Sequence, residues 1–152
     1  MKRLLNIRDA TKELNILRSL NNYKRPFSLL GTYRLIDDGT RPEATVTIRS
    51  EGGQTHEAAT GVGPVDALAT VLKKSLASIF PFIRTVKLVD FESKIHDTKA
   101  GTSARVVVSI VFTDGSEIWS VEAVSENINM ASFMALVDGF EYAILLKENS
   151  LI

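Results

Sequence analysis

The sequence contains one order of patterns twice, and this duplication is the feature that most constrains the fold. Three strand-like runs are followed by a helix-like run, first within residues 27–80 and again within residues 86–148. Thr45-Val46-Thr47-Ile48 corresponds to Val107-Val108-Ser109-Ile110, about 62 residues later. Two copies indicate pseudo-two-fold symmetry rather than a solenoid. We therefore predict an α+β fold of two pseudo-symmetric strand-strand-strand-helix units, each an antiparallel sheet covered by one helix.

The element boundaries follow from periodicity and from Gly and Pro. Residues 43–50 alternate apolar and polar side chains, which is typical of a half-buried strand. Val65, Leu68, Val71 and Leu72 recur at helical spacing, and Pro81 ends that run. The predicted strands are residues 27–37, 43–50, 55–60, 86–97, 104–112 and 117–124, and the predicted helices are residues 64–80 and 128–147.

The N-terminal stretch reads differently from the two repeats. Residues 1–20 carry leucines and isoleucines at ragged spacing, which we interpret as a helix, and Pro26 prevents its simple continuation. We assign residues 1–22 as a helical linker remnant and residues 23–152 as the domain that contains both repeats. A frayed terminus is the alternative.

Composition narrows the class of protein. The 152 residues are 45% apolar and 24% charged, which suits one ordinary globular domain. The formal net charge is zero, so neither nucleic acid nor an anionic membrane is indicated as a partner. Cysteine is absent, which excludes disulfides and thiolate sites and agrees with a cytoplasmic location. No apolar run reaches the roughly 18 residues of a membrane span.

The turn Gly61-Val62-Gly63-Pro64-Val65-Asp66-Ala67 is the most distinctive local motif. Two glycines permit a sharp turn and a close approach of another group, and Pro64 fits the first turn of a helix. The helix N-terminus could offer N–H groups to a carboxylate, or Asp66 could accept from them instead. A plain strand-to-helix turn remains the alternative at this point. Ser125-Glu126-Asn127 is its counterpart in the second repeat.

No catalytic constellation stands out. The two histidines, His56 and His96, have no metal-ligand partner at helical or hairpin spacing. The carboxylate pairs, such as Asp90 and Glu92, are typical of solvated strand edges, and no nucleophile elbow or phosphate loop is present. We therefore predict no catalytic residues, no metal and no cofactor. The two helix entrances could instead converge on a cavity for a small zwitterion.

Three motifs in order resemble a known family. Gly61-Val62-Gly63-Pro64-Val65-Asp66-Ala67-Leu68 resembles the Gly-x-Gly-Pro-Val-Asp-Ala motif of the C-terminal regulatory domain of the 2-isopropylmalate synthase and (R)-citramalate synthase family. Leu88-Val89-Asp90-Phe91 with Ala100-Gly101-Thr102-Ser103-Ala104, and Ser125-Glu126-Asn127-Ile128, resemble the family's later motifs. Residues 23–27, 124–128 and 135–138 are most similar to the citramalate branch. The resemblance covers residues 23–147, most of the chain.

The resemblance implies a non-catalytic regulatory domain. In the family this domain forms a homodimer and binds an end-product amino acid at the dimer interface. Binding inhibits a separate acyl-CoA-condensing barrel, which this chain does not contain. Isoleucine is implied for a citramalate-type enzyme and leucine for an isopropylmalate-type enzyme. The implied effector contacts are Gly61, Gly63, Val65, Ala67, Leu88, Phe91, Ile95, Ala104, Val106, Ser125, Asn127 and Ile128.

One departure from the family pattern bears on the ligand. Phe91 stands where tyrosine is usual, so a hydroxyl hydrogen bond is missing there. Phe91 and Ile95 are also bulky enough to fill a cavity themselves. A structural dimerisation module without ligand binding is therefore the alternative function, and a small enzyme based on the histidines and acidic pairs is a third.

Overall fold

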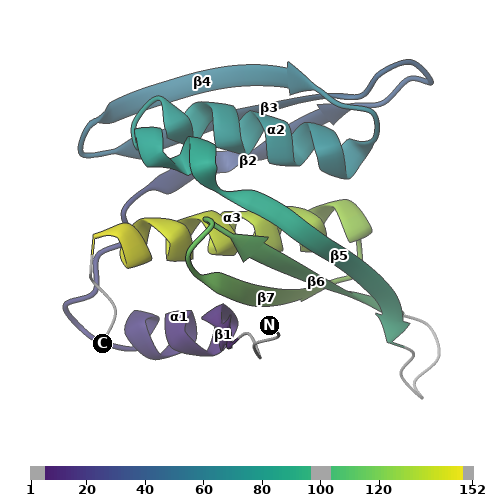
Figure 1. Ribbon diagram of the computed structural model, residues 1–152. Coiled ribbons are helices and arrows are strands. Elements are labelled where there is room, and N and C mark those ends of the chain that lie inside the picture. Colours follow the sequence, from purple (N-terminus) through teal and green to yellow (C-terminus); the bar gives the residue numbers. More distant parts are fainter. Residues whose placement is uncertain (1–5, 97–103, 149–152) are drawn as a thin grey trace. The chain divides into compact units, whose positions relative to one another are not determined.

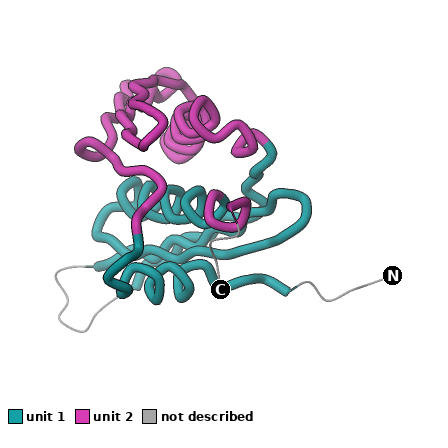
Figure 2. Tube along the Cα trace, turned by 90° about the vertical axis from the view of Figure 1, so that its left-hand side faces the viewer, with its two compact units in different colours: residues 1–23, 85–143 teal, residues 24–84, 144–152 magenta. Residues whose placement is uncertain are grey.

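The computed structural model describes residues 6–96 and 104–148 and shows a mixed α+β chain in two compact units (Figures 1 and 2). Unit 1 comprises residues 1–23 and 85–143, and unit 2 comprises residues 24–84 and 144–152. Each unit therefore takes residues from separate stretches of the chain. The predicted fold of two strand-strand-strand-helix repeats is confirmed.

Unit 2 contains the first repeat. Its antiparallel sheet has the order β2 (Ser28–Ile36), β3 (Glu43–Ser50) and β4 (Gly53–Thr60). The helix α2 (Pro64–Ala77) lies against this sheet (Figure 1). Ala44, Val46 and Ile48 of the central strand are buried, as the alternation of residues 43–50 predicts. A 3₁₀ turn, Pro81–Thr85, follows α2, because Pro81 lacks the N–H that a longer helix would need.

Unit 1 contains the second repeat and the N-terminal stretch. Its sheet has the order β1 (Ile7–Asp9), β7 (Ile118–Ser125), β6 (Arg105–Thr113) and β5 (Lys87–His96). Strands β5 to β7 are antiparallel, whereas β1 pairs in parallel with β7. The helix α1 (Ala10–Arg18) follows β1 directly, and α3 (Ile128–Lys147) follows β7. Residues 97–103, which hold most of the Ala100–Ala104 motif, lie outside the described residues.

The N-terminal prediction is wrong in one respect. Residues 7–9 are a strand rather than part of a helix, since they pair with β7 from Ile7↔Ile118 to Asp9↔Ser120. Asp9 then starts the helix, because its carboxylate accepts a hydrogen bond from the Lys12 N–H at 3.1 Å. Most of this stretch therefore belongs to the packed structure of unit 1. Its role as a linker remnant stays a prediction.

Aromatic packing holds α3 to the sheet of unit 1. Phe112 stacks on Trp119 with ring centroids 6.0 Å apart and meets the edge of Phe140 at 5.7 Å. The indole N–H of Trp119 donates to the backbone carbonyl of Gly139 at 3.0 Å. Gly139 lies so close to Phe112 that an added Cβ would be 2.1 Å from two ring carbons. Helix and sheet can therefore approach this closely only because residue 139 has no side chain.

The apolar character of α3 follows from burial. By length and composition alone α3 could span a membrane, but 72% of its apolar window is buried inside the fold. A helix that is apolar all round is typical of a protein core as well as of a membrane. Packing therefore accounts for its composition.

Candidate functional site

The predicted effector contacts fall into two groups that lie in different units. Gly61, Gly63, Val65 and Ala67 are at the entrance of α2 in unit 2. The other eight are in unit 1: Leu88, Phe91, Ile95, Ala104, Val106, Ser125, Asn127 and Ile128.

Strand register brings three of the unit 1 contacts together, whereas Leu88 pairs with Phe112 at the other end of β5. Ile95 on β5 pairs with Val106 on β6, and Val106 pairs with Ser125 on β7. Phe91 pairs with Ile110, so it shares this face of the sheet, because side chains alternate along a strand. This is the face that α3 covers farther along β6, where Ile110 and Phe112 are fully buried.

The covered face ends in exposed apolar side chains. Phe91 is 38% exposed, Ile95 is 70% exposed and Ile128, the first residue of α3, is 42% exposed. Val106 is half-buried. We call Phe91, Ile95, Val106 and Ile128 the apolar end of unit 1. Ala104, just before β6, is exposed as well. Such a group of exposed apolar side chains indicates an interaction site.

The entrance of α3 is already capped. The Asn127 side-chain oxygen accepts hydrogen bonds from the N–H groups of Asn129 at 2.7 Å and Met130 at 3.1 Å. The Asn127 N–H in turn donates to the Ser125 hydroxyl at 3.3 Å. These bonds satisfy donors that would otherwise be free for an anion. The repeat offset of about 62 residues makes Ser125 the counterpart of Gly63. In the structure, however, the residue that precedes and caps α3 is Asn127, two residues later.

The entrance of α2 is built differently. Gly63 provides no side-chain cap, and Asp66 turns away from the helix to accept from the Val62 N–H at 2.9 Å. An added Cβ on Gly63 would meet nothing within 4 Å. The hydrogen bond to the Asp66 carboxylate therefore comes from the turn before the helix, and not from the N–H groups of the first helical turn that it was expected to satisfy as one alternative. The α2 entrance leaves room beside Gly63.

Gly61 and Ala67 have a packing role instead. The Gly61 N–H donates to the carbonyl of Pro42 at 3.0 Å. A Cβ at Gly61 would lie 2.4 Å from the backbone nitrogen of Ala67, which is fully buried. The motif thus contains one glycine required by close packing and one that faces open space.

A polar cluster between α1 and α3 was not predicted from the sequence. The Arg18 guanidinium donates to Asp138 and to Glu141, both at 2.8 Å. The Tyr23 hydroxyl also donates to Glu141, whose side chain is completely buried. Burial would lower the pKa of Arg18, but its hydrogen bond to Asp138 and the charge of Glu141 outweigh this and raise it. The available signal was a pair of acids within the apolar run 128–147.

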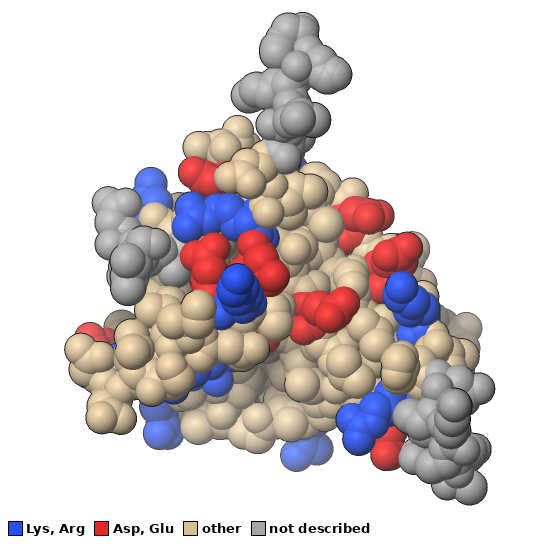
Figure 3. All heavy atoms as spheres, turned by 90° about the horizontal axis from the view of Figure 1, so that it is seen from below, with Lys and Arg blue, Asp and Glu red and all other residues tan. Residues whose placement is uncertain are grey.

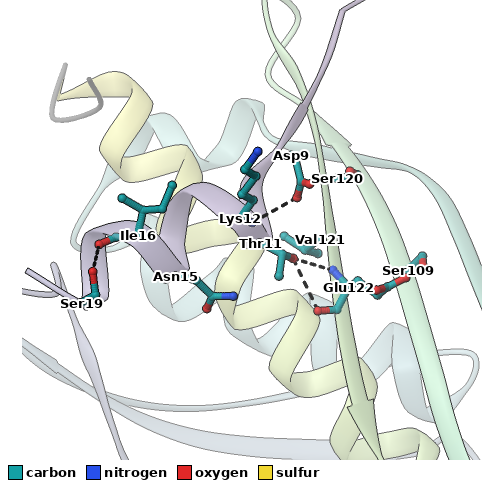
Figure 4. A pocket seen from close by; sticks show the side chains of 10 residues that line it. All are labelled: Asp9, Thr11, Lys12, Asn15, Ile16, Ser19, Ser109, Ser120, Val121 and Glu122. Atoms are coloured by element: carbon teal, nitrogen blue, oxygen red, sulfur yellow. Dashed lines mark hydrogen bonds between the residues drawn. The ribbon is translucent and has the colours of Figure 1, made fainter.

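A polar groove adjoins the other side of α1 (Figure 4). It has a volume of about 670 Å³ and is open to solvent. Thr11 fixes α1 to β7, because its hydroxyl accepts from the Glu122 N–H at 2.8 Å. The lining residues are Asp9, Thr11, Lys12, Asn15, Ile16, Ser19, Ser109, Ser120, Val121 and Glu122.

Neither the charges nor the histidines indicate a further site. On the face in Figure 3, basic and acidic side chains lie beside one another rather than in patches of one sign. His56 is exposed and its ring nitrogen lies 2.6 Å from the Thr47 hydroxyl on the neighbouring strand. Among residues 6–96 and 104–148, no group of three or more metal-ligating side chains occurs.

Comparison with known proteins identifies what the chain resembles. Residues 8–144 match the family model of the LeuA allosteric (dimerisation) domain. The chain is 36% identical over 146 residues to an (R)-citramalate synthase of Geobacter sulfurreducens and equally to one of Aquifex aeolicus, covering 92% of this chain and 28% of each relative. A Synechocystis (R)-citramalate synthase is 40% identical over 103 residues, covering 68% of this chain and 19% of the relative. The chain therefore spans less than a third of the length of these relatives.

Proposed function

The chain belongs to the LeuA allosteric (dimerisation) domain family, and on that premise we propose that it senses a branched-chain amino acid for a citramalate-type synthase. The relatives compared above are (R)-citramalate synthases. The proposed role is end-product feedback inhibition of an acyl-CoA-condensing catalytic domain or chain, with the present chain acting as a homodimer without catalytic activity of its own.

The observation that carries the proposal is the apolar end of unit 1. Ile95 and Val106 face the same side of the sheet as the fully buried Ile110, yet Ile95 is 70% exposed. Leaving such surface in water is unfavourable by about 25 cal/mol per Å² of apolar area, so a ligand side chain or a second copy that covers it gains free energy. An aliphatic side chain matches these residues in size and polarity.

The polar half of an amino acid needs different partners. Ser125 pairs with Val106 at the same end of the sheet and has a hydroxyl that could reach a ligand ammonium or carboxylate. Isoleucine is favoured by the citramalate relatives, and leucine is the second candidate.

Inhibition would follow from a coupling free energy. An effector that binds one arrangement of the dimer more tightly shifts the population toward it, by typically about 1–3 kcal/mol in allosteric proteins. The catalytic domain would respond to that shift. No chemistry of its own is required of this chain.

The proposal is tested by calorimetric titration and thermal unfolding of the chain with L-isoleucine and L-leucine. Binding should raise the melting temperature with ligand concentration, since a ligand of the native state stabilises it by about 2.7 kcal/mol at one hundred times its Kd. The D-enantiomers are matched controls, because they keep the apolar side chain and change only its position relative to the charged groups.

A titration without heat, together with a dimer in sedimentation, would instead establish a structural dimerisation module. In that case the apolar end of unit 1 is covered by protein alone. Ile95→Ser separates the two functions further. It should abolish amino-acid binding if Ile95 contacts the ligand, and it should weaken only the dimer in the alternative.

A further inference from the structure

The helix α1 is fastened to unit 1 at both of its ends. At its start, β1 pairs with β7 and the Thr11 hydroxyl accepts from the Glu122 N–H. At its end, Arg18 contacts Asp138 and Glu141 in the second half of α3. The apolar side chains between these points, Leu14 and Leu17, are buried. α1 is therefore attached to β7 at its start and to α3 at its end.

The contact at the end of α1 differs in kind from a surface ion pair. Glu141 has no exposed side-chain area, and both the Arg18 guanidinium and the Tyr23 hydroxyl donate to it. Removing a single partner of such a pair leaves a buried charge unsatisfied, which is strongly destabilising. We call this group of four side chains the α1–α3 clamp; its members are Arg18, Tyr23, Asp138 and Glu141.

One helix carries both the clamp and predicted effector contacts. α3 begins at Ile128, directly after its cap Asn127, and Glu141 lies thirteen residues farther along, about 20 Å at 1.5 Å per residue. Between them the helix is held against the sheet by Gly139, Phe112 and Trp119. A packed helix moves as a body, so a displacement at its start is transmitted to its second half.

We propose that the α1–α3 clamp is the contact through which α3 reports the state of the effector site to α1. The inference rests on the proposed function, because it assigns the effector to the end of unit 1 where α3 starts. The clamp residues touch no ligand; they are positioning residues. Their role is to make the position of α1 depend on that of α3.

Hydrogen exchange of the whole chain, followed by mass spectrometry, tests this proposal. The exchange of α1 amides is measured with and without saturating L-isoleucine or L-leucine, and separately in Asn127→Ala, which perturbs the start of α3 without any ligand. The central strand β6 reports global opening in the same experiment. Both perturbations should change the exchange of α1, taken relative to that of β6, by about fivefold or more, the lower range of allosteric couplings.

The clamp is then removed by Arg18→Met combined with Glu141→Gln, which avoids leaving the fully buried Glu141 as an unpaired charge, whereas the Asp138 side chain is 21% exposed and can be hydrated. Lys12→Met is the matched control, since it removes a positive charge from an exposed position of the same helix. The α1 response should shrink below about twofold in the clamp variant, against fivefold or more in the control.

Each outcome decides between the two proposals. Ligand heat without any α1 response, or an equal response in the clamp variant, overturns the clamp and leaves the sensing function standing. If no amino acid binds, the sensing function fails. The exchange of α1 amides in the Asn127→Ala variant then tests the clamp alone. A change in β6 exchange equal to that in α1 would mean global destabilisation, which also overturns the specific coupling.

Discussion

Replacing Gly139 by alanine should destabilise the chain, although alanine is the better helix former. Gly139 lies inside α3, where an exposed Gly→Ala change stabilises a helix by about 1 kcal/mol. Against this, the new Cβ would lie 2.1 Å from the Cε1 and Cζ atoms of Phe112, and 3.4 Å is the lower end of ordinary contact. The ring must therefore move by more than about 1 Å.

The ring of Phe112 has little room to move. It stacks on Trp119 with an angle of 3° between the planes and meets Phe140 in an edge-on contact. Overpacking of this kind typically costs about 1–3 kcal/mol, and the rigid surroundings favour the upper part of that range. After the propensity gain is subtracted, a net loss of roughly 1–2 kcal/mol remains. For a chain of this size that lowers the melting temperature by about 2–4 °C per kcal/mol.

The assay uses Trp119, the only tryptophan of the chain, which donates to the carbonyl of Gly139 itself. Urea unfolding followed by its fluorescence gives the free energy of unfolding. Gly63→Ala is the control for steric conflict, because its Cβ meets nothing within 4 Å and its φ of −145° suits any residue, so that any loss there reflects only the poorer N-cap. Phe112→Leu makes room for the new Cβ. In that background, Gly139→Ala should therefore lower the free energy of unfolding by at least about 0.5 kcal/mol less than it does in the native chain. An unchanged or higher midpoint for Gly139→Ala would refute the packing argument.

Three further predictions concern single side chains. Gly61→Ala should destabilise by about 1–3 kcal/mol in thermal unfolding, since the Cβ would meet the backbone nitrogen of Ala67 at 2.4 Å; an unchanged melting temperature would contradict this. Asn127→Ala should lose about 0.5–2 kcal/mol in urea unfolding and Asn127→Asp much less, because only the latter can still cap α3; equal losses would exclude capping as the cause. Burial raises the pKa of Tyr142, so its stabilising contribution is complete below about pH 10, the unfolded value, and is lost as the pH rises further. Tyr142→Phe should therefore lose less stability than the native chain above that pH, and identical pH profiles would rule out this contribution.

Much of the fold is predictable because its signals are local. Residues 43–50 alternate, Pro64 opens a helix and Pro81 prevents its extension, and the structure places β3 and the start of α2 at those residues. The repeat then predicts the second unit from the first. Such arguments work where the secondary structure is set by neighbours in sequence.

The features that sequence reasoning missed depend on distant partners. Ile7-Arg8-Asp9 has no strand pattern of its own and is a strand only because β7, more than a hundred residues away, accepts it. Glu141 reads as an interruption of an apolar helix until Arg18 and Tyr23 are placed beside it. The α3 cap differs from the α2 entrance because Asn127 supplies an oxygen that Gly63 lacks. Periodicity contains no information on such pairings.

The predicted effector residues can be ranked by whether the fold already uses them. Gly61 and Ala67 are committed to close packing at the start of α2, and Asn127 is committed to the α3 cap. Phe91, in the middle of β5, and Ile95, near its end, have no such role, because their apolar side chains are exposed. A ligand can therefore gain more binding free energy from contact with Phe91 and Ile95 than from contact with Gly61, Ala67 or Asn127.

Phe91→Tyr tests this ranking directly. Phe91 is 38% exposed, so the added hydroxyl can reach water, and the stability of the free chain should change by no more than about 0.5 kcal/mol. If Phe91 lines the effector site, the hydroxyl gains or displaces one hydrogen bond of about 0.5–1.5 kcal/mol, which changes the Kd for the amino acid about two- to tenfold in calorimetry. Phe82→Tyr, outside the predicted contacts, is the control. An unchanged Kd for Phe91→Tyr, with binding intact, would place the ligand away from the apolar end of unit 1.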